Sequence, residues 1–354
     1  MTLARSEPRL ASAFGGAFEL GCAVGGKLFD SSSQPERALV TWHFASLTPE
    51  NCMKPEPIHP EPGRYDFTGA DVLVDFAEHH ALRSVGHTLC WHQQTPNWFF
   101  QPDADDRTVR ERLSDHIHTV VERYRGRIYG WDVVNEAIAD DAAVASGGYL
   151  RDTPWLRALG EDYLHFAFQC AREADPSAEL YYNDYNLERP AKRARALRLL
   201  RSLLDRGAPL AGVGIQGHWL VDQIPFEDIE QAIEEYAALG LKVMFTELDL
   251  DVIDRPDCSA DLAVQRAYSL AEDIYRAGCP AEVLERQAEQ YARLFRLFAG
   301  AQAVTRVTFW GLHDGLSWLN SWPGKRTNHP LVFDRECRPK PAFWRVLEAS
   351  PSRH

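Results

Sequence analysis

Several kinds of segment are missing from this sequence of 354 residues. No stretch reaches the roughly 18 apolar residues of a membrane-spanning helix, so we expect no membrane partner. No low-complexity segment and no linker rich in Pro, Gly or Ser divides the chain into two folded halves. The N-terminal residues lack the continuous apolar stretch of a signal peptide, which predicts a cytoplasmic protein, although a chain trimmed of its leader would look the same.

Basic residues are scarce relative to acidic ones. The chain has 38 Lys and Arg against 51 Asp and Glu, which gives a formal net charge of −13. A surface this acidic repels phosphate backbones, so we expect no nucleic-acid partner. A neutral or small-molecule substrate fits this charge better.

The cysteines and histidines do not form a metal-binding or redox motif. The seven Cys are irregularly spaced and include no C-x-x-C pair. Cys258 and Cys279 could pair across a loop, and the others are expected to be reduced and buried. The only H-x-H, formed by His116 and His118, lies in a helical pattern, where positions two apart point about 200° away from each other. We therefore expect no metal site.

What the sequence does contain is an alternation of short apolar runs with longer stretches of helical spacing. The runs that predict strands are 19–25, 44–47, 84–89, 128–134, 179–184, 212–217, 242–248 and 306–312. The clearest helical patterns are 71–81, 110–125, 191–207 and 226–240. Eight strands alternating with helices predict an α/β fold, a single (β/α)8 TIM barrel that takes up residues 1–354. The remaining segments 95–108, 137–160 and 251–282 would be long βα loops, which build the active-site face of such barrels.

Polar and aromatic side chains gather at the C-terminal ends of all these runs except the first. In chain order they are Glu50, Asn51, Lys54, His87, Trp91, His92, Asn135, Glu136, Asn183, Asp184, Tyr185, Asn186, Gln216, His218, Trp219, Glu247, Asp249, Trp310, His313, Asp314 and Trp318. One mouth of the barrel would then hold carboxylates, neutral hydrogen-bonding groups and indoles. This mixture suits an uncharged, polyhydroxylated ligand, because indoles cover the apolar faces of sugar rings.

Two of these residues could carry the chemistry. Glu136 ends the fourth run and Glu247 ends the seventh, so their side chains can meet across the mouth. A pair of carboxyl groups flanking a bond is the minimum machinery for glycoside hydrolysis, because one must donate a proton while the other is ionised. Two nearby carboxyls push their pKa values apart and so supply both forms. Taken alone, Glu247 could instead lie at a helix N-terminus or pair with Lys242 or Arg306, and the histidines and indoles resemble ordinary core residues.

The chain closely resembles glycoside hydrolase family 10, the retaining endo-β-1,4-xylanases, from roughly residue 14 to residue 347. The stretches that carry the resemblance are TPENCMKPE (48–56), GHTLCWHQQTPNW (86–98), WDVVNEAI (131–138), YYNDYN (181–186), GIQGHW (214–219), FTELD (245–249) and FWGLHDGLSWL (309–319). They occur in the family order on successive expected strands, which makes the combination very specific.

The resemblance implies a role for each matching residue. Glu136 would be the general acid/base and Glu247 the nucleophile. His218 and Asp249 would orient Glu247 and tune its charge, and Asn135 would hydrogen-bond the 2-hydroxyl of the sugar under attack. The residues implied in substrate binding are Glu50, Asn51, Lys54, His87, Trp91, Asn135, Gln216 and His218, with Trp310 and Trp318 as the indoles around the site and Tyr185 on the leaving-group side.

The resemblance also implies a double-displacement hydrolysis of xylan or xylo-oligosaccharides that needs no metal or organic cofactor. The two carboxyl groups of such a retaining enzyme lie about 5–5.5 Å apart. The lack of a secretion signal resembles the intracellular members of the family, and the oligomeric state stays open. One departure from the family pattern is Pro55, where many members have an aromatic residue, so a stiffer backbone is expected there. Two alternatives remain: a β-1,4-glucanase, and a sugar-binding barrel without catalysis.

Overall fold

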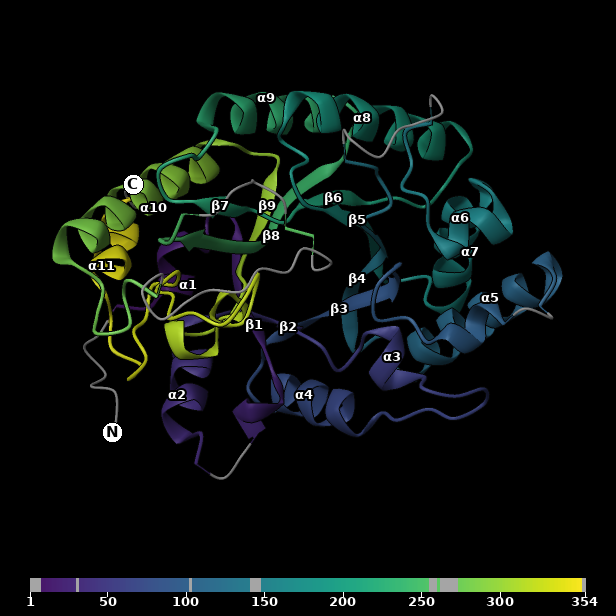
Figure 1. The fold of residues 1–354 in the computed structure, drawn as a ribbon, viewed down its shortest axis with the longest axis horizontal. Helices are drawn as coiled ribbons and strands as arrows, with labels where there is room; N and C mark the ends of the chain where they lie inside the picture. Colours follow the sequence, from purple (N-terminus) through teal and green to yellow (C-terminus); the bar gives the residue numbers. More distant parts are fainter. Residues whose placement is uncertain are drawn as a thin grey trace.

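Eight parallel strands form a closed barrel in the computed structural model, which describes residues 8–29, 32–101, 104–140, 148–254, 260–261 and 273–351 (Figure 1). The barrel strands are β1 (Glu19–Val24), β2 (Ser46–Pro49), β3 (Arg83–Cys90), β4 (Ile128–Asn135), β5 (Glu179–Asp184), β6 (Gly212–Ile215), β8 (Lys242–Asp251) and β9 (Val304–Phe309). They neighbour one another in the order β6-β5-β4-β3-β2-β1-β9-β8, and the parallel pairing of β6 with β8 closes the barrel.

Helices follow the strands and ring the barrel on the outside (Figure 1). The α-helices are α1 (Leu10–Phe14), α2 (Gln34–His43), α3 (Pro55–Ile58), α4 (Thr68–His79), α5 (Asp106–Arg123), α6 (Pro154–Leu159), α7 (Asp162–Ala174), α8 (Pro190–Asp205), α9 (Phe226–Ala237), α10 (Ala281–Gly300) and α11 (Pro341–Glu348). The short 3-10 helices are η1 (Gly26–Phe29), η2 (Asn97–Phe100), η4 (Asp314–Leu316) and η5 (Trp318–Asn320). The (β/α)8 barrel predicted from the alternation is therefore confirmed.

The structure adds elements that the sequence pattern did not predict. Gly217, with a φ of 84°, bends the chain after β6. The chain then forms a short strand, β7 (His218–Leu220), which pairs with the end of β8 and places His218 opposite Asp249. The predicted loops also contain short helices: η2 lies within 95–108 and α6 within 137–160. Parts of the predicted loops 95–108, 137–160 and 251–282 lie outside the described residues.

The barrel wall is closely packed where β3 meets β4. Trp131 of β4 is fully buried, and its indole lies against Gly86 of β3. A Cβ atom at residue 86 would come within 2.0 Å of the Trp131 ring, so only glycine fits there. The two strands that carry His87 and Glu136 are thus fixed against each other at this point.

Among the described residues, none of the helices has the length and apolar character needed to cross a membrane. Cys279 is a free thiol, so it does not form the pair with Cys258 that the sequence allowed; Cys258 itself lies outside the described residues.

Candidate active site

A cavity of about 220 Å³ lies at the C-terminal ends of the barrel strands. Its lining residues are Glu50, Asn51, Lys54, His87, Trp91, Gln94, Asn135, Glu136, Gln216, His218, Glu247, Ala260, Trp310, Trp318, Ser321 and Trp322. All the residues to which the family resemblance gives a role line this cavity, except Tyr185 and Asp249. Both key glutamates face this one cavity.

Glu136 follows directly after β4 and is only 5% exposed. Its Oε2 accepts a hydrogen bond from Trp91 Nε1 at 2.8 Å, and its Oε1 accepts from Gln216 Nε2 at 2.9 Å and from Asn135 Nδ2 at 3.2 Å. Its backbone has a φ of 58°, in the left-handed region that residues other than Gly seldom adopt. The backbone N–H donates to the Asn183 carbonyl at 2.9 Å, so β5 fixes the start of this turn.

Glu247 lies within β8 and is held by partners from two other strands. Its Oε1 accepts a hydrogen bond from Asn183 Nδ2 at 2.8 Å, and its Oε2 lies 3.3 Å from His218 Nε2. Asp249 points to the same side of β8 as Glu247, because side chains alternate along a strand. Its Oδ1 lies 3.0 Å from His218 Nδ1, and its Oδ2 accepts from Trp318 Nε1 at 2.7 Å. His218 is thus clamped between two carboxylates.

These surroundings shift the pKa values of the two glutamates in opposite directions. Burial raises the pKa of Glu136, the hydrogen bond from Gln216 opposes this, and the charge of Glu247 raises the pKa further. Burial also acts to raise the pKa of Glu247, but the hydrogen bond from His218, the nearby imidazoles and the hydrogen bond from Asn183 outweigh it, so this pKa lies below its ordinary value. Although burial opposes its charge, Asp249 and Glu247 raise the pKa of His218 to about 9. The site therefore favours a protonated Glu136 beside an ionised Glu247.

Lys54 reaches the cavity from the start of α3. Pro55 occupies the first position of this helix, and Lys54 before it is extended, with φ −68° and ψ 153°, as the residue preceding a proline prefers. Its Nζ donates to Asn51 Oδ1 at 3.0 Å and lies 5.0 Å from the centre of the Trp91 ring. Burial lowers the pKa of Lys54, and burial raises the pKa of Glu50 beside it.

Three indoles form one wall of the cavity. Trp318 and Trp322 stack with ring centres 4.6 Å apart and an angle of 24° between their planes. Trp310 meets His87 edge to face at 5.2 Å, and the ring of His218 lies 4.9 Å from that of Trp318. Such a wall offers flat apolar surface beside the hydrogen-bonding groups, as a sugar ring requires.

Tyr185 lies apart from the cavity lining. Only 1% of it is exposed, and its hydroxyl donates to Asp140 Oδ2 at 2.5 Å and accepts from Arg151 Nη2 at 2.6 Å. Lys192 Nζ lies 3.6 Å from the centre of its ring. In this structure Tyr185 is therefore part of a charged cluster behind the site, whereas the family resemblance gives it a place on the leaving-group side.

Some residues of the site were missed in the sequence interpretation. Gln94 and Trp322 line the cavity. Asp132 Oδ2 lies 2.9 Å from His87 Nδ1 and so holds that ring. Asp132 had a signal, because it alternates in β4 between apolar neighbours. Asn183 was expected at the end of the fifth run, but its bond to Glu247 was not.

The alternative partners considered for Glu247 lie elsewhere. Lys242, at the start of β8, is 2.6 Å from Glu179, and Arg306 Nη1 donates to the Tyr129 hydroxyl at 2.8 Å. These contacts belong to the opposite end of the barrel, where the strands begin.

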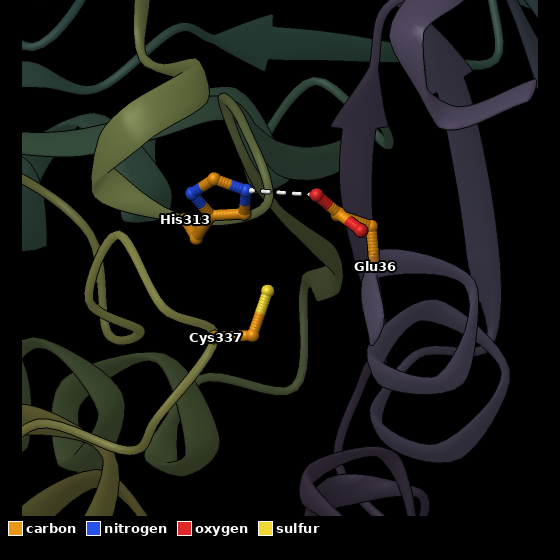
Figure 2. A group of neighbouring side chains, drawn as sticks. All are labelled: Glu36, His313 and Cys337. Atoms are coloured by element: carbon orange, nitrogen blue, oxygen red, sulfur yellow. Dashed lines mark ion pairs between the residues drawn. The ribbon is translucent and has the colours of Figure 1, made fainter. Parts of the chain in front are cut away.

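One group among the described residues has donor atoms close enough to suggest a cation: Glu36, His313 and Cys337 (Figure 2). His313 Nδ1 already accepts the Gly315 N–H at 3.1 Å. Burial lowers the pKa of His313, so the ring is neutral and its one proton is on Nε2, which lies 3.8 Å from Glu36 Oε1. In this arrangement the ring offers no lone pair to a metal, and the 3.8 Å between His313 Nε2 and Glu36 Oε1 is too long for a hydrogen bond.

Comparisons with known proteins agree with this geometry. The model of glycosyl hydrolase family 10 matches residues 9–349. Endo-1,4-beta-xylanase B of Paenibacillus barcinonensis is 43% identical over 346 residues, which cover 96% of this chain and 98% of that protein. A GH10 endoxylanase retrieved from a sugarcane soil metagenome has a TM-score of 0.91 at 37% identity, covering 96% of this chain and 99% of its own. A mutant in complex with xylotriose has a TM-score of 0.87 at 39% identity, covering 97% of this chain and 100% of its own.

The match spans almost the whole chain, and the closed parallel barrel with paired carboxyls at its mouth agrees with it. The chain belongs to glycosyl hydrolase family 10 and is a glycoside hydrolase.

Proposed function

We propose that this protein is an endo-1,4-β-xylanase that cleaves β-1,4-xylosidic bonds in xylan or xylo-oligosaccharides with retention of configuration. The observation that carries the proposal is the pair of buried glutamates on one cavity, with the pKa of Glu136 raised and that of Glu247 lowered. The names of the relatives, and the xylotriose bound to one of them, support xylose polymers as the substrate class.

In the first step Glu136 gives its proton to the glycosidic oxygen while Glu247 attacks the anomeric carbon. The bond from that carbon to the leaving oxygen breaks, and an ester bond to Glu247 forms. The electrons of the broken bond stay on the leaving oxygen, which takes the proton. Asn183 and His218 hold the attacking carboxylate in place through their contacts with its two oxygens.

In the second step Glu136, now ionised, takes a proton from water. The water oxygen attacks the anomeric carbon, and the ester to Glu247 breaks. Two inversions restore the original configuration, and both carboxyls return to their starting protonation. The same residue therefore acts first as acid and then as base, which its position among the neutral donors Trp91, Gln216 and Asn135 allows.

The remaining cavity residues would bind the sugar. Glu50, Asn51 and Lys54 offer acceptors and donors to hydroxyl groups at one side of the cavity, and the indole wall covers a ring face. Asn135 would hydrogen-bond the 2-hydroxyl of the sugar under attack, a contact that strengthens in the transition state.

The test is a product time course on xylohexaose with the anomeric configuration followed by NMR. We expect shorter xylo-oligosaccharides whose new reducing ends appear first as the β-anomer. The α-anomer appearing first would refute retention, and no release of reducing sugar would favour a binding protein. Faster turnover of aryl cellobioside than of aryl xylobioside would favour a glucanase instead.

A further inference from the structure

The strained backbone of Glu136 must be held by its surroundings. A residue other than Gly is strained in the left-handed region, and it persists there only where neighbouring contacts over-determine it. Contacts from β5 account for the N–H groups of this turn: Glu136 N donates to Asn183 O at 2.9 Å, and Ala137 N and Ile138 N donate to the Tyr182 hydroxyl at 3.1 and 3.2 Å. The carbonyl oxygen of Glu136 needs a partner from elsewhere.

That partner is Arg151, whose Nε donates to the Glu136 carbonyl at 3.3 Å. The segment that carries Arg151 folds back along the turn: Arg151 N donates to Ala137 O at 2.8 Å, and Ile138 pairs with Leu150 in an antiparallel bridge. The guanidinium is thus delivered to the turn by backbone pairing, and its side chain is only 12% exposed.

The other two nitrogens of the same guanidinium bind two further loops and Asp140 in the loop that carries Arg151 itself. Nη1 donates to Asp261 Oδ2 at 3.2 Å, in the segment after β8. Nη2 donates to Asp140 Oδ2 at 3.2 Å, after β4, and to the Tyr185 hydroxyl at 2.6 Å, after β5. Asp261 Oδ1 in turn accepts from Gln93 Nε2 at 2.8 Å, after β3. Only the planar fork of arginine can donate to so many acceptors at once.

Two cations, Arg151 and Lys192, contact the carboxylates of this cluster. Lys192 Nζ lies 3.1 Å from Asp140 Oδ1 and 2.9 Å from Asp184 Oδ1, so Lys192 and Arg151 share the Asp140 carboxylate. Arg151 Nη1 also lies 3.2 Å from Asp261 Oδ2, and its Nε donates to the Glu136 carbonyl. Its positive charge also acts to lower the pKa of Glu136 and so moderates the effect of burial.

We propose that Arg151 is a positioning residue for the acid/base, which fixes the left-handed turn of Glu136 and locks the loops after β3, β4, β5 and β8 behind it. This inference rests on the proposed function, because it gives Glu136 a proton-transfer role whose geometry must be precise. Small misplacements of a catalytic group can cost about 10²-fold in rate.

The experiment compares two substrates in the full-length protein carrying Arg151→Gln. One substrate is xylohexaose, whose leaving group needs a proton, and the other is a dinitrophenyl xylobioside, whose leaving group does not. We expect kcat/KM to fall about 10–10²-fold on the first and less than about 3-fold on the second. Because a positive charge is lost, the basic limb of the pH profile should move to higher pH. Arg151→Lys should restore little, because an ammonium cannot reproduce the fork.

The matched control is Arg195→Gln, which removes a similar arginine-to-carbonyl bond, from Arg195 Nη1 to Ala139 O at 2.9 Å. Any of three results would overturn the inference. These are equal losses on the two substrates in Arg151→Gln, the same difference between the substrates in Arg195→Gln, or wild-type rates in Arg151→Lys. If Arg151→Gln does not fold, Asp261→Asn can replace it, because it weakens the contact of Arg151 with the loop after β8. We expect a smaller difference in kcat/KM between the two substrates, in the same direction. Equal losses on both substrates would count against the role of these contacts.

Glu136→Gln on the same substrates separates two kinds of failure. No difference between substrates in that variant would refute the acid role and with it the proposed function. A difference in Glu136→Gln but none in Arg151→Gln would refute only the role of Arg151.

Discussion

The two ends of the barrel carry the same kinds of ionisable side chain in different surroundings. Where the strands begin, two acids have a basic partner near solvent: Arg83 lies 3.1 Å from Glu19, and Lys242 lies 2.6 Å from Glu179. The four side chains are 16–52% exposed. Such pairs are screened by water and salt, and contribute about 0–1 kcal/mol each.

Where the strands end, carboxyls are buried and share their partners. The carboxyl of Glu136 accepts from the neutral groups Trp91, Gln216 and Asn135, whereas Glu247 competes with Asp249 for the single imidazole of His218. Burial therefore raises the pKa of Glu136, whereas the partners of Glu247 outweigh burial and lower its pKa. The comparison teaches that the chemistry of this site depends on buried carboxyls that have no cation of their own. A carboxylate that pairs with its own solvent-exposed cation contributes only to stability.

The largest expected effect comes from Glu247→Ala. We expect kcat to fall more than about 10⁴-fold on every substrate, beyond the usual range for a lost general acid, because no ester can form. Azide can enter the space left by the carboxylate and attack the same carbon, so it should partly restore turnover of aryl glycosides with an inverted glycosyl azide as product. Initial rates with and without azide, and NMR of the product, provide the measurement. A variant that stays active without azide would remove Glu247 from the nucleophile role.

Glu136→Ala should have the next largest effect, and one that depends on the leaving group. Loss of a general acid costs about 10²–10⁴-fold where the departing oxygen needs a proton. Dinitrophenyl glycosides need little protonation, so their first step should be much less affected. A burst of dinitrophenol followed by slow turnover would reveal the loss of the base in the second step. Equal losses for xylohexaose and the aryl glycoside would contradict the assignment.

Asp249→Asn tests the sharing of His218. With one carboxylate neutralised, the pKa of His218 should fall from about 9, so its proton would support Glu247 less. The pKa of Glu247 should then rise, and the acidic limb of kcat/KM should move to higher pH. One charged hydrogen bond contributes about 1.5–3 kcal/mol, so we expect roughly 10–10²-fold lower activity below neutral pH and less loss above it. Asp222→Asn, on the exposed pair with Arg286, serves as the control and should leave the profile unchanged.

Much of this site could be predicted from the sequence, because strand ends are local signals. The apolar run 128–134 followed by Asn135 and Glu136 fixes both a buried strand and the place where it stops. Since parallel strands bring their ends to one face, the common location of Glu136 and Glu247 follows from the order of runs alone.

What could not be predicted depends on contacts between loops. The bonds from Arg151 to Asp261 and Tyr185 join residues 110 and 34 positions apart, and an arginine in a loop gives no sign of its partners. The left-handed backbone of Glu136 also has no sequence signal, because Gly or Asn usually occupies that conformation. Likewise, the bend at Gly217 extends the strand pairing past the point where the apolar run ends.

The smallest expected effect is at the other end of the barrel, in Glu179→Gln and Lys242→Gln. Burial acts to raise the pKa of Glu179. The ion pair with Lys242 and the hydrogen bond from Tyr181 outweigh burial and hold this pKa below its ordinary value. The pair therefore stabilises the fold above the unfolded pKa of a glutamate, and this contribution is lost as pH falls through the lower, folded value. Urea unfolding of the two variants and the double variant at pH 7 should give a coupling of at most about 1 kcal/mol, which decreases in acid and in high salt. If kcat/KM on xylohexaose stays unchanged within about twofold, the end of the barrel where the strands begin contributes stability alone. A larger change in rate would mean that charges at the two ends are coupled through the barrel.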